Sequence, residues 1–227
     1  MTAPTYLPAE DRARVGEAVS RAEADTAGEI VTILADRSDG YTDVALSWAV
    51  LASFAAMTIF ALFPEPYLAR LDWLLGRWHQ EWTLHQVLAV SLGFGVVKFI
   101  GVMLIQAIQP VKFFLIPPPI RTARVHERAV RAFRIGAERR THGRTGILIY
   151  LSMREHRAEI VADEAIATKV DPEVWGDAMD AMLAELKQGR VADGMIAAVT
   201  RVGKVLAEHF PRPENDVNEL PDRLIEV

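Results

Sequence analysis

The sequence predicts an α/β fold in which a small central sheet flanked by helices is interrupted by a two-helix transmembrane hairpin. Two long apolar runs, Val44–Phe63 and Val87–Ile108, predict the hairpin. Two shorter runs, Glu29–Ala35 and Ile147–Ser152, lie on either side of it and have the composition of strands. Because stretches of helical periodicity accompany both strands, we expect the polar segments before and after the hairpin to fold together as one domain.

Composition excludes several classes of protein. The chain has 227 residues, of which 51% are hydrophobic, and its formal net charge of −5 predicts no general affinity for nucleic acid. It contains no cysteine, which excludes a disulfide scaffold, a thiolate zinc site and a cysteine nucleophile. The first 43 residues contain no apolar segment of the kind found in signal peptides. No P-loop, dinucleotide fingerprint, nucleophile elbow or histidine zinc motif occurs.

Residues 1–43 are expected to supply the first helix and strand of the domain. Over Pro8–Ala24 apolar residues recur at helical spacing, and proline suits the first turn of a helix. Gly28 ends this pattern. Glu29–Ala35 then reads EIVTILA, a β-branched run that predicts a strand.

Residues 44–108 make up the expected hairpin. Val44–Phe63 has no charged residue and would be about 30 Å long as a helix, the thickness of a bilayer core. The connecting loop, residues 64–86, carries leucine and tryptophan at helical spacing. This favours a short helix in the membrane interface over the alternative of an irregular loop.

Lys98 lies near the middle of the second apolar run. A central lysine costs about 2.5–3.5 kcal/mol on insertion scales, which the apolar residues around it are expected to outweigh. Lys98 could pair with an acid of a partner helix or line a polar path; alternatively, its ammonium group snorkels to the membrane surface. Neither run contains an acid, and two spans cannot enclose a polar path. A polar path would therefore require a homo-oligomer, whose close helix contacts Gly93, Gly95 and Gly101 would permit.

The chain after the hairpin is expected to complete the domain. Residues 109–120 are interpreted as a linker that ends in a stiff spacer of three prolines. Residues 121–210 are expected to hold the remainder of the domain, and residues 211–227 an acidic tail. The elements predicted within 121–210 are a helix over Arg121–Arg140, a hairpin of strands Ile147–Ser152 and Arg157–Ala162, and helices over residues 172–188 and 193–209.

The distribution of lysine and arginine predicts the orientation of the hairpin. The loop over residues 64–86 carries two such residues, Arg70 and Arg77, whereas five lie within twenty residues of the outer ends of the hairpin. Basic residues favour the cytoplasmic side. We therefore expect a multi-pass protein of a bacterial-type inner membrane, with both termini and the globular domain in the cytoplasm and the loop outside.

A basic stripe is expected on one face of the helix over residues 121–140. Each basic residue near an anionic leaflet contributes about 1 kcal/mol of attraction, so the stripe is a candidate site for lipid headgroups. The alternative is a solvated face with ion pairs four residues apart, such as Arg131 with Glu127. The stripe consists of Arg121, Arg124, Arg128 and Arg131.

Acidic residues near one end of the predicted sheet form a candidate metal site. Carboxylates are the ligands that calcium and magnesium prefer, so a weakly bound ion, above all calcium, is the expected cofactor if there is one. The alternative is that Asp171 and Asp193 are helix N-caps and that the other carboxylates are solvated. The four candidates are Asp163, Glu164, Asp171 and Asp193.

Three stretches resemble the TPM-domain family, which includes photosystem II repair factors and a receptor accessory protein. Ala27–Val31 is similar to the start of the family's first strand, Gly143–Ser152 to its second strand, and Ala192–Gly194 to the opening of its last helix. The resemblance covers about residues 8–35 and 121–210, and the membrane hairpin lies outside it.

The resemblance implies an α/β sandwich with a small central sheet. Acid phosphatase activity and calcium binding have been proposed for some members, in which a glycine-rich turn follows the third strand and precedes an acid. Here the acid matches Asp171, but the turn, Ala162–Ala165, contains no glycine. A turn without glycine approaches a phosphate less closely.

The expected function is therefore that of a non-catalytic accessory or assembly factor, with no catalytic residue assigned. A membrane hairpin in the lipid bilayer would display a TPM-like domain to a membrane protein complex. One alternative is a membrane-anchored acid phosphatase that depends on a divalent cation. A second alternative is a homo-oligomeric membrane assembly.

Overall fold

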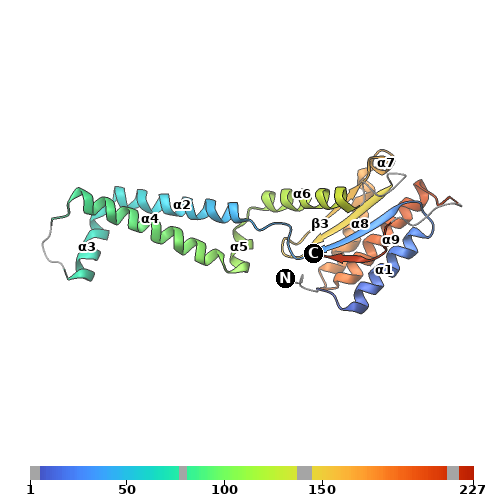
Figure 1. The fold of residues 1–227 in the computed structure, drawn as a ribbon, viewed down its shortest axis with the longest axis horizontal. Helices are drawn as coiled ribbons and strands as arrows, with labels where there is room; N and C mark the ends of the chain where they lie inside the picture. Colours follow the sequence, from blue (N-terminus) through green and yellow to red (C-terminus); the bar gives the residue numbers. More distant parts are fainter. Residues whose placement is uncertain (1–5, 77–80, 137–144, 214–219) are drawn as a thin grey trace. The chain divides into compact units, whose positions relative to one another are not determined.

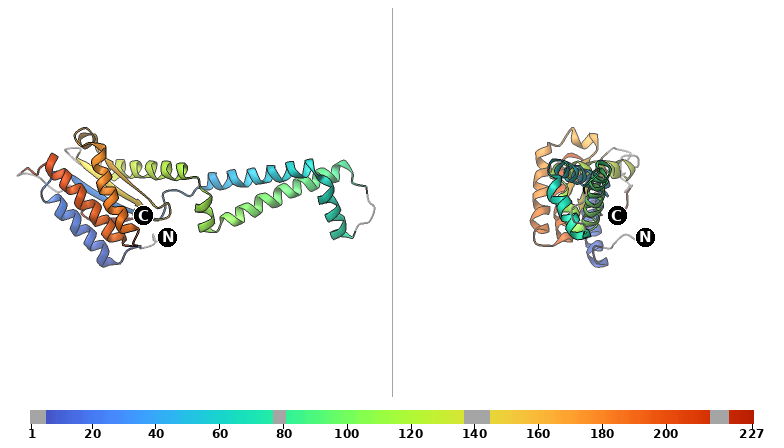
Figure 2. Two further views of the ribbon diagram at one scale, coloured as in Figure 1. Left: turned by 180° about the vertical axis from the view of Figure 1, so that it is seen from behind. Right: turned by 90° about the vertical axis from the view of Figure 1, so that its left-hand side faces the viewer.

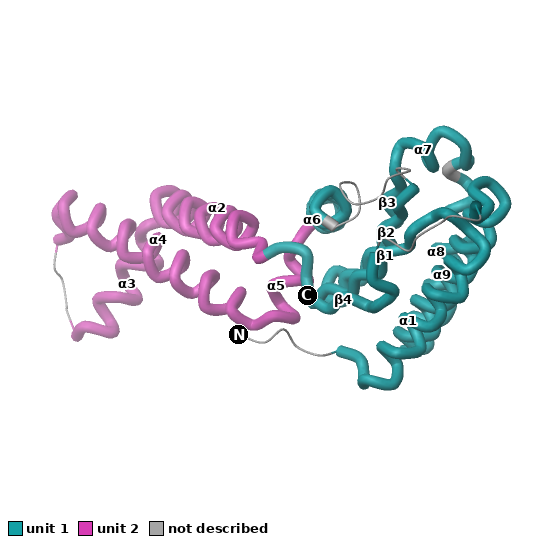
Figure 3. Tube along the Cα trace, turned by 45° about the vertical axis from the view of Figure 1, so that its right-hand side comes forward, with its two compact units in different colours: residues 1–39, 118–227 teal, residues 40–117 magenta. Residues whose placement is uncertain are grey.

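The computed structural model describes residues 6–76, 81–136, 145–213 and 220–227 (Figure 1). The chain forms two compact units (Figure 3). Unit 1 consists of residues 1–39 and 118–227, and unit 2 of residues 40–117. Unit 2 contains the predicted hairpin, so the segments on either side of the hairpin do belong to one folded body.

A four-stranded sheet forms the centre of unit 1. Its order is β3-β2-β1-β4, with β1 (Glu29–Ala35) parallel to β2 (Gly146–Ser152) and β2 antiparallel to β3 (Arg157–Ala162). The parallel register places Glu29 opposite Gly146 and Ala35 opposite Ser152. The predicted pairing of the first two strands and the predicted strand hairpin are both confirmed.

The fourth strand, β4 (Leu224–Glu226), lies within the segment predicted to be an acidic tail. It pairs in parallel with β1, with Thr32 opposite Leu224 and Leu34 opposite Glu226. The interpretation of residues 211–227 as a tail is therefore wrong at its end. The Glu226 carboxylate accepts a hydrogen bond from the Leu7 amide at 3.0 Å, so β4 also contacts the start of the domain.

Three helices cover one face of the sheet: α1 (Ala9–Glu23), α8 (Pro172–Leu186) and α9 (Val191–His209) (Figure 2). The apolar side chains that alternate along the strands on this face form the main core with them. Helices α1 and α9 lie in close contact, because a Cβ atom on Gly203 would approach the Ala22 Cβ to 2.6 Å. The principal strand residues of this core are Ile30, Leu34, Ile147, Ile149 and Leu151.

Helix α6 (Pro118–Gly136) covers the other face of the sheet. Its buried stripe, Val125, Ala129 and Phe133, packs on Leu148 and Tyr150 of β2. The helix begins within the three prolines, because proline fits the first turn of a helix, so the predicted linker is wrong there. The predicted end of this helix, Arg140, lies outside the described residues.

Unit 2 is an α-helical hairpin with two short helices attached to it. Its long helices, α2 (Thr42–Leu62) and α4 (Leu84–Gln106), pack along each other, and α3 (Pro64–Leu75) follows α2 in the predicted loop. The segment predicted to be a linker holds α5 (Gln109–Leu115), so it is helical rather than extended.

Small and polar groups lie where the two long helices meet. The Ser53 hydroxyl donates to the Gly95 carbonyl oxygen at 2.9 Å, and the Gln106 side chain donates to the Ala45 carbonyl oxygen at 3.0 Å. A Cβ atom on Gly95 would come within 2.7 Å of the Met57 sulfur. The backbones therefore approach closely along a narrow stripe.

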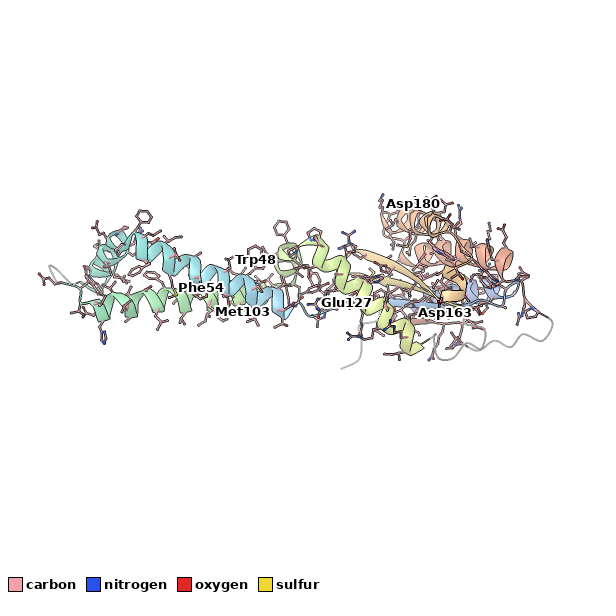
Figure 4. All side chains as sticks on the ribbon, turned by 90° about the horizontal axis from the view of Figure 1, so that it is seen from above. Trp48, Phe54, Met103, Glu127, Asp163 and Asp180 are labelled. Carbon is pink, nitrogen blue, oxygen red and sulfur yellow. The ribbon has the colours of Figure 1, made fainter. Side chains whose placement is uncertain are left out.

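The apolar side chains of unit 2 point mostly outward. Helices α2 and α4 are long and apolar enough to cross a membrane, and only 22% and 6% of their most apolar windows are buried within the structure. Phe54 is 64% exposed and Leu92 is 60% exposed; Trp48 and Phe54 are labelled on α2 in Figure 4. The helix of a soluble core would instead be largely buried. By length, composition and exposure, α2 and α4 are therefore candidate membrane spans.

Candidate functional site

Asp163 of the predicted metal site is buried beside the sheet (Figure 4). It follows β3, and its Oδ2 atom accepts a hydrogen bond from the Gly146 amide at 3.0 Å. The Gly146 carbonyl oxygen in turn accepts from the Asp163 amide at 2.9 Å. The carboxylate thus joins the end of the strand β3 to the beginning of the strand β2.

The other three candidates lie in different surroundings. Asp171 caps α8 by accepting from the Glu173 amide at 3.5 Å, as the N-cap alternative predicted. Asp193 lies in the first turn of α9, which begins at Val191, so its prediction as an N-cap is wrong. Its carboxylate pairs with Arg14 at 2.6 Å.

The predicted convergence of these carboxylates is not present. Among the residues that the structure describes, no group of three or more histidine, cysteine, aspartate or glutamate side chains could hold a metal ion. Glu164 opens the four-residue helix α7 (Glu164–Ala167) and is exposed. A divalent-cation site therefore stays a prediction.

Three of the four arginines of the predicted basic stripe line the same hollow beside α6, and binding of lipid headgroups there stays a prediction. Arg124 forms ion pairs with Asp39 at 3.2 Å and with Glu127 at 3.7 Å. Arg128 and Arg131 are exposed and have no ion pair with any residue that the structure describes. Arg121 is half-buried, and its Nε atom has no hydrogen-bond partner among the described residues.

This hollow, of about 200 Å³, lies between α6 and the segment that follows β1. We call it the arginine hollow. Three guanidinium groups and two carboxylates surround it, so its lining carries a net positive charge. Its lining residues are Ser38, Asp39, Arg124, Glu127, Arg128 and Arg131, and Glu127 is labelled on α6 in Figure 4.

A buried polar network lies next to the arginine hollow. The Ser38 hydroxyl is 3.1 Å from the Tyr150 hydroxyl and 3.1 Å from the Ser152 hydroxyl. Ser152 donates to one carboxylate oxygen of Glu155 at 2.5 Å, and the Ser38 amide donates to the other at 2.9 Å. Tyr150, Ser152 and Glu155 are all buried. This network fixes Ser38, one wall of the hollow.

Tyr150 is also close to one arginine of the hollow. Burial raises the pKa of the Tyr150 phenol, and its hydrogen bond with Ser38 and the nearby positive charge of Arg128 act in the opposite direction. Arg128 therefore lies within electrostatic reach of the Tyr150 oxygen. The sequence carries one signal for this contact, a single tyrosine in the otherwise apolar run of β2.

Another buried acid lies at the end of α1, which packs on the opposite face of the sheet from α6. Glu23 is 8% exposed, and its Oε1 atom accepts from the Ile30 amide at 2.7 Å. Burial raises the pKa of Glu23 to about 8, against the effect of this hydrogen bond, and the negative charges of Asp222 and Glu29 raise it further. Glu23 therefore holds a proton at neutral pH. Its sequence position, at the end of an amphipathic helix, gave no sign of this.

Lys98 is exposed on α4. Within the described part of the chain it has no ion pair, which agrees with the absence of an acid in either apolar run. The structure therefore leaves both interpretations of Lys98, an oligomer contact and snorkelling, as predictions.

Comparison with known proteins identifies the domain. A family model described as the TPM domain matches residues 118–205. Among solved structures, the chain is similar to the NMR structure of the BA42 protein from the psychrophilic bacterium Bizionia argentinensis, with 18% identity and a TM-score of 0.56. That alignment covers 98% of this chain and 97% of the other, and at such identity it shows the fold alone. No curated protein matches the sequence. The family match and the shared fold agree with the resemblance seen in the sequence, and residues 118–205 therefore match a TPM domain.

Proposed function

We propose that this protein is a membrane-anchored, non-catalytic accessory or assembly factor for a membrane protein complex. One observation carries the proposal: a pair of candidate membrane helices is inserted between β1 and α6 of a single sheet domain. The domain is thus tethered at both ends of the insertion. A double tether restricts a domain to the membrane surface, where it can contact other membrane proteins.

The orientation is part of this proposal. We propose that unit 1 and both termini are cytoplasmic and that the turn of the hairpin lies outside, as the distribution of lysine and arginine indicates. Of the two basic residues in the loop, Arg70 lies in α3 and Arg77 lies outside the described residues. The chain has no native cysteine, so single cysteines can report the orientation.

The orientation test uses Leu75→Cys in α3 and Arg201→Cys in α9, both at exposed positions. On intact cells, Leu75→Cys should react with a membrane-impermeant thiol reagent, and Arg201→Cys should react only after lysis. The reverse pattern would contradict the cytoplasmic placement of the domain. Labelling of both on intact cells would contradict the anchor itself.

The non-catalytic part of the proposal is supported by the surroundings of the acidic residues. Asp163 is hydrogen-bonded to the backbone, Asp171 caps a helix and Asp193 pairs with Arg14. We propose that a divalent cation, if one binds at all, binds weakly. Calcium should then raise the Tm of the purified protein only slightly.

The experiment combines native electrophoresis of mildly solubilised membranes with a phosphatase assay on the purified full-length protein. We expect the protein to migrate with a larger assembly, and phosphate ester hydrolysis to stay at background with or without calcium or magnesium. Hydrolysis that disappears in Asp163→Asn would support the phosphatase alternative. Asparagine can still accept the bond from Gly146, so this variant should fold. An assembly of this chain alone would support the homo-oligomer alternative.

A further inference from the structure

Two guanidinium groups of the arginine hollow form no ion pair with any residue that the structure describes. Arg124 is held by Asp39 at 3.2 Å and by Glu127 at 3.7 Å, so its charge is largely compensated within the lining. Arg128 and Arg131 line the same hollow, and neither forms an ion pair within the described part of the chain. The two positions are three residues apart, so they are neighbours on the helix surface. Two adjacent guanidinium groups can donate several hydrogen bonds to one tetrahedral anion.

The buried network determines which groups can donate into the hollow. Because Ser152 gives its hydrogen to the Glu155 carboxylate, Ser38 must give its own hydrogen to Ser152. Tyr150 must then donate to Ser38, since neither hydroxyl has a second hydrogen. All three hydrogens therefore run toward Glu155. The Tyr150 oxygen can then only accept a further hydrogen bond, and the positive charge of Arg128 acts on it.

This direction of the hydrogen bonds gives Tyr150 a positioning role. A phenol oxygen that can only accept from Arg128 restrains that guanidinium group at the edge of the hollow. Ser38, whose hydrogen is used within the network, offers no donor to a ligand. Arg128 and Arg131 are then the principal donors that the lining presents to an anion.

We propose that the arginine hollow binds a phosphate group, with Arg128 and Arg131 donating to its oxygens and Tyr150 positioning Arg128. A volume of about 200 Å³ exceeds the roughly 30 Å³ that one water occupies in the liquid, so a polyatomic anion has room. A phospholipid headgroup and free phosphate share the chemistry that these donors recognise. The proposal names a ligand for the domain and leaves open which complex the domain assists.

The lipid source rests on the proposed membrane anchor. Only Gly40 and Tyr41 separate Asp39, in the lining of the hollow, from Thr42, where the first candidate span begins. An extended chain advances at most about 3.6 Å per residue. If α2 crosses the bilayer, this short link keeps Asp39 near the headgroups.

The experiment uses full-length protein in phosphatidylcholine nanodiscs, with two ligand arms. In the first arm inorganic phosphate is titrated in solution, against chloride at equal ionic strength. In the second arm phosphatidic acid is included in the nanodisc and no free phosphate is present. The readouts are the Tm of unit 1 and, well below the Tm, the phosphate Kd from calorimetry.

We expect a higher Tm in at least one arm. A response to phosphatidic acid would identify the headgroup as the source, and a response to dissolved phosphate alone would identify the free anion. The double variant Arg128→Gln with Arg131→Gln should weaken phosphate affinity about tenfold or more, because each removes a charge-assisted donor. Arg201→Gln, an exposed arginine of α9, is the matched control and should respond as the native protein does.

Tyr150→Phe tests the positioning role separately. It should weaken the phosphate Kd measured well below the Tm, although both arginines remain. An unchanged Kd with a lowered Tm would show that Tyr150 is only structural.

No response in either arm, or a response that survives the double arginine variant, would overturn the phosphate site. Extraction of the protein from native membranes by alkaline carbonate would overturn the anchor instead, and the free-phosphate arm would still stand.

Discussion

The two units use the same apolar residue types in opposite ways. In unit 1, Ile149 and Leu34 are fully buried between the sheet and the helices that cover it. In unit 2, Leu92 and Phe54 lie 60% and 64% exposed on helices that contact each other along one stripe. Water drives apolar surface inward, whereas lipid removes that driving force and leaves packing to small and polar groups. The contrast is the one expected if the two candidate spans of unit 2 lie in a membrane, as we propose.

The largest expected effect comes from removing the same kind of side chain in the two units. Ile149→Ala in β2 should lower the free energy of unfolding of unit 1 by about 2–5 kcal/mol, because it removes buried methyl groups and leaves a cavity. Leu92→Ala on the exposed surface of α4 is the matched change and should leave the free energy of unfolding unchanged. Urea unfolding in detergent, followed by circular dichroism, measures both. An equal loss of unfolding free energy in the two variants would contradict this difference between the units.

A titration should expose the protonated acid in the interior of unit 1. The pKa of Glu23 rises from 4.5 to about 8 on folding, so between these values the folded protein holds a proton that the unfolded chain has lost. The free energy of unfolding should then fall as pH rises through this window, by at most about 1.4 kcal/mol per pH unit. Above about pH 8 this contribution levels off.

Glu23→Gln should flatten that pH dependence and make the protein more stable than the native form above pH 8, since glutamine needs no proton to stay neutral. Glu208→Gln, at an exposed position on α9, is the control and should keep the native profile. Thermal melts across the pH range give the comparison. A Glu23→Gln profile that follows the native one would mean that Glu23 does not control the titration.

A smaller effect should mark the inward stripe of unit 2. Gly95→Leu should destabilise the packing of α2 on α4 by about 1–3 kcal/mol, because its Cβ would meet Met57 and Ser53 at 3.0 Å or less. Gly93→Leu on the same helix meets nothing within 4 Å and should be tolerated. Protease resistance of the hairpin in detergent separates the two. Equal sensitivity would show that α2 and α4 do not pack through Gly95.

The smallest effect concerns an acid of the predicted metal site. If Asp171 acts only as a helix cap, Asp171→Ala should cost about 1 kcal/mol, and Asp171→Asn should cost much less, because asparagine is also a good N-cap. If Asp171 instead held a cation, asparagine would lose the charge and calcium would no longer raise the Tm. Thermal melts of both variants with and without calcium distinguish the two roles.

Much of the fold could be predicted because its signals are local. The β-branched run Glu29–Ala35 and the apolar run Ile147–Ser152 became neighbouring parallel strands, and Pro172 opened a helix capped by Asp171. Strand β4 could not be found in this way, because it has three residues and follows an acidic segment. Its pairing depends on the exposed edge of β1, which only the folded sheet presents.

The candidate sites were less predictable, because side-chain partners come from distant parts of the chain. Helical spacing predicted that arginines of α6 share one face, but it could not show that Asp39 forms an ion pair with Arg124. The acids near the end of the sheet were expected to converge, yet Asp163 accepts a hydrogen bond from the Gly146 amide and Asp193 forms an ion pair with Arg14. The positions of these acids in the sequence predicted a cluster of carboxylates. In the folded chain the carboxylates bind to backbone amides and to an arginine of α1 instead.

The position of β1 in the sheet has a consequence for biosynthesis. Both of its neighbours, β2 and β4, follow the hairpin in the sequence, so a ribosome releases Ala35 before any residue of the hairpin and Gly146 only after all of it. Throughout that interval β1 has no partner strand, and unpaired strand edges favour aggregation. The domain can close only around a hairpin that has already been made. A chain whose synthesis stops within the hairpin would thus leave β1 open to chaperones and proteases, and completion of the sheet reports that both helices have been synthesised.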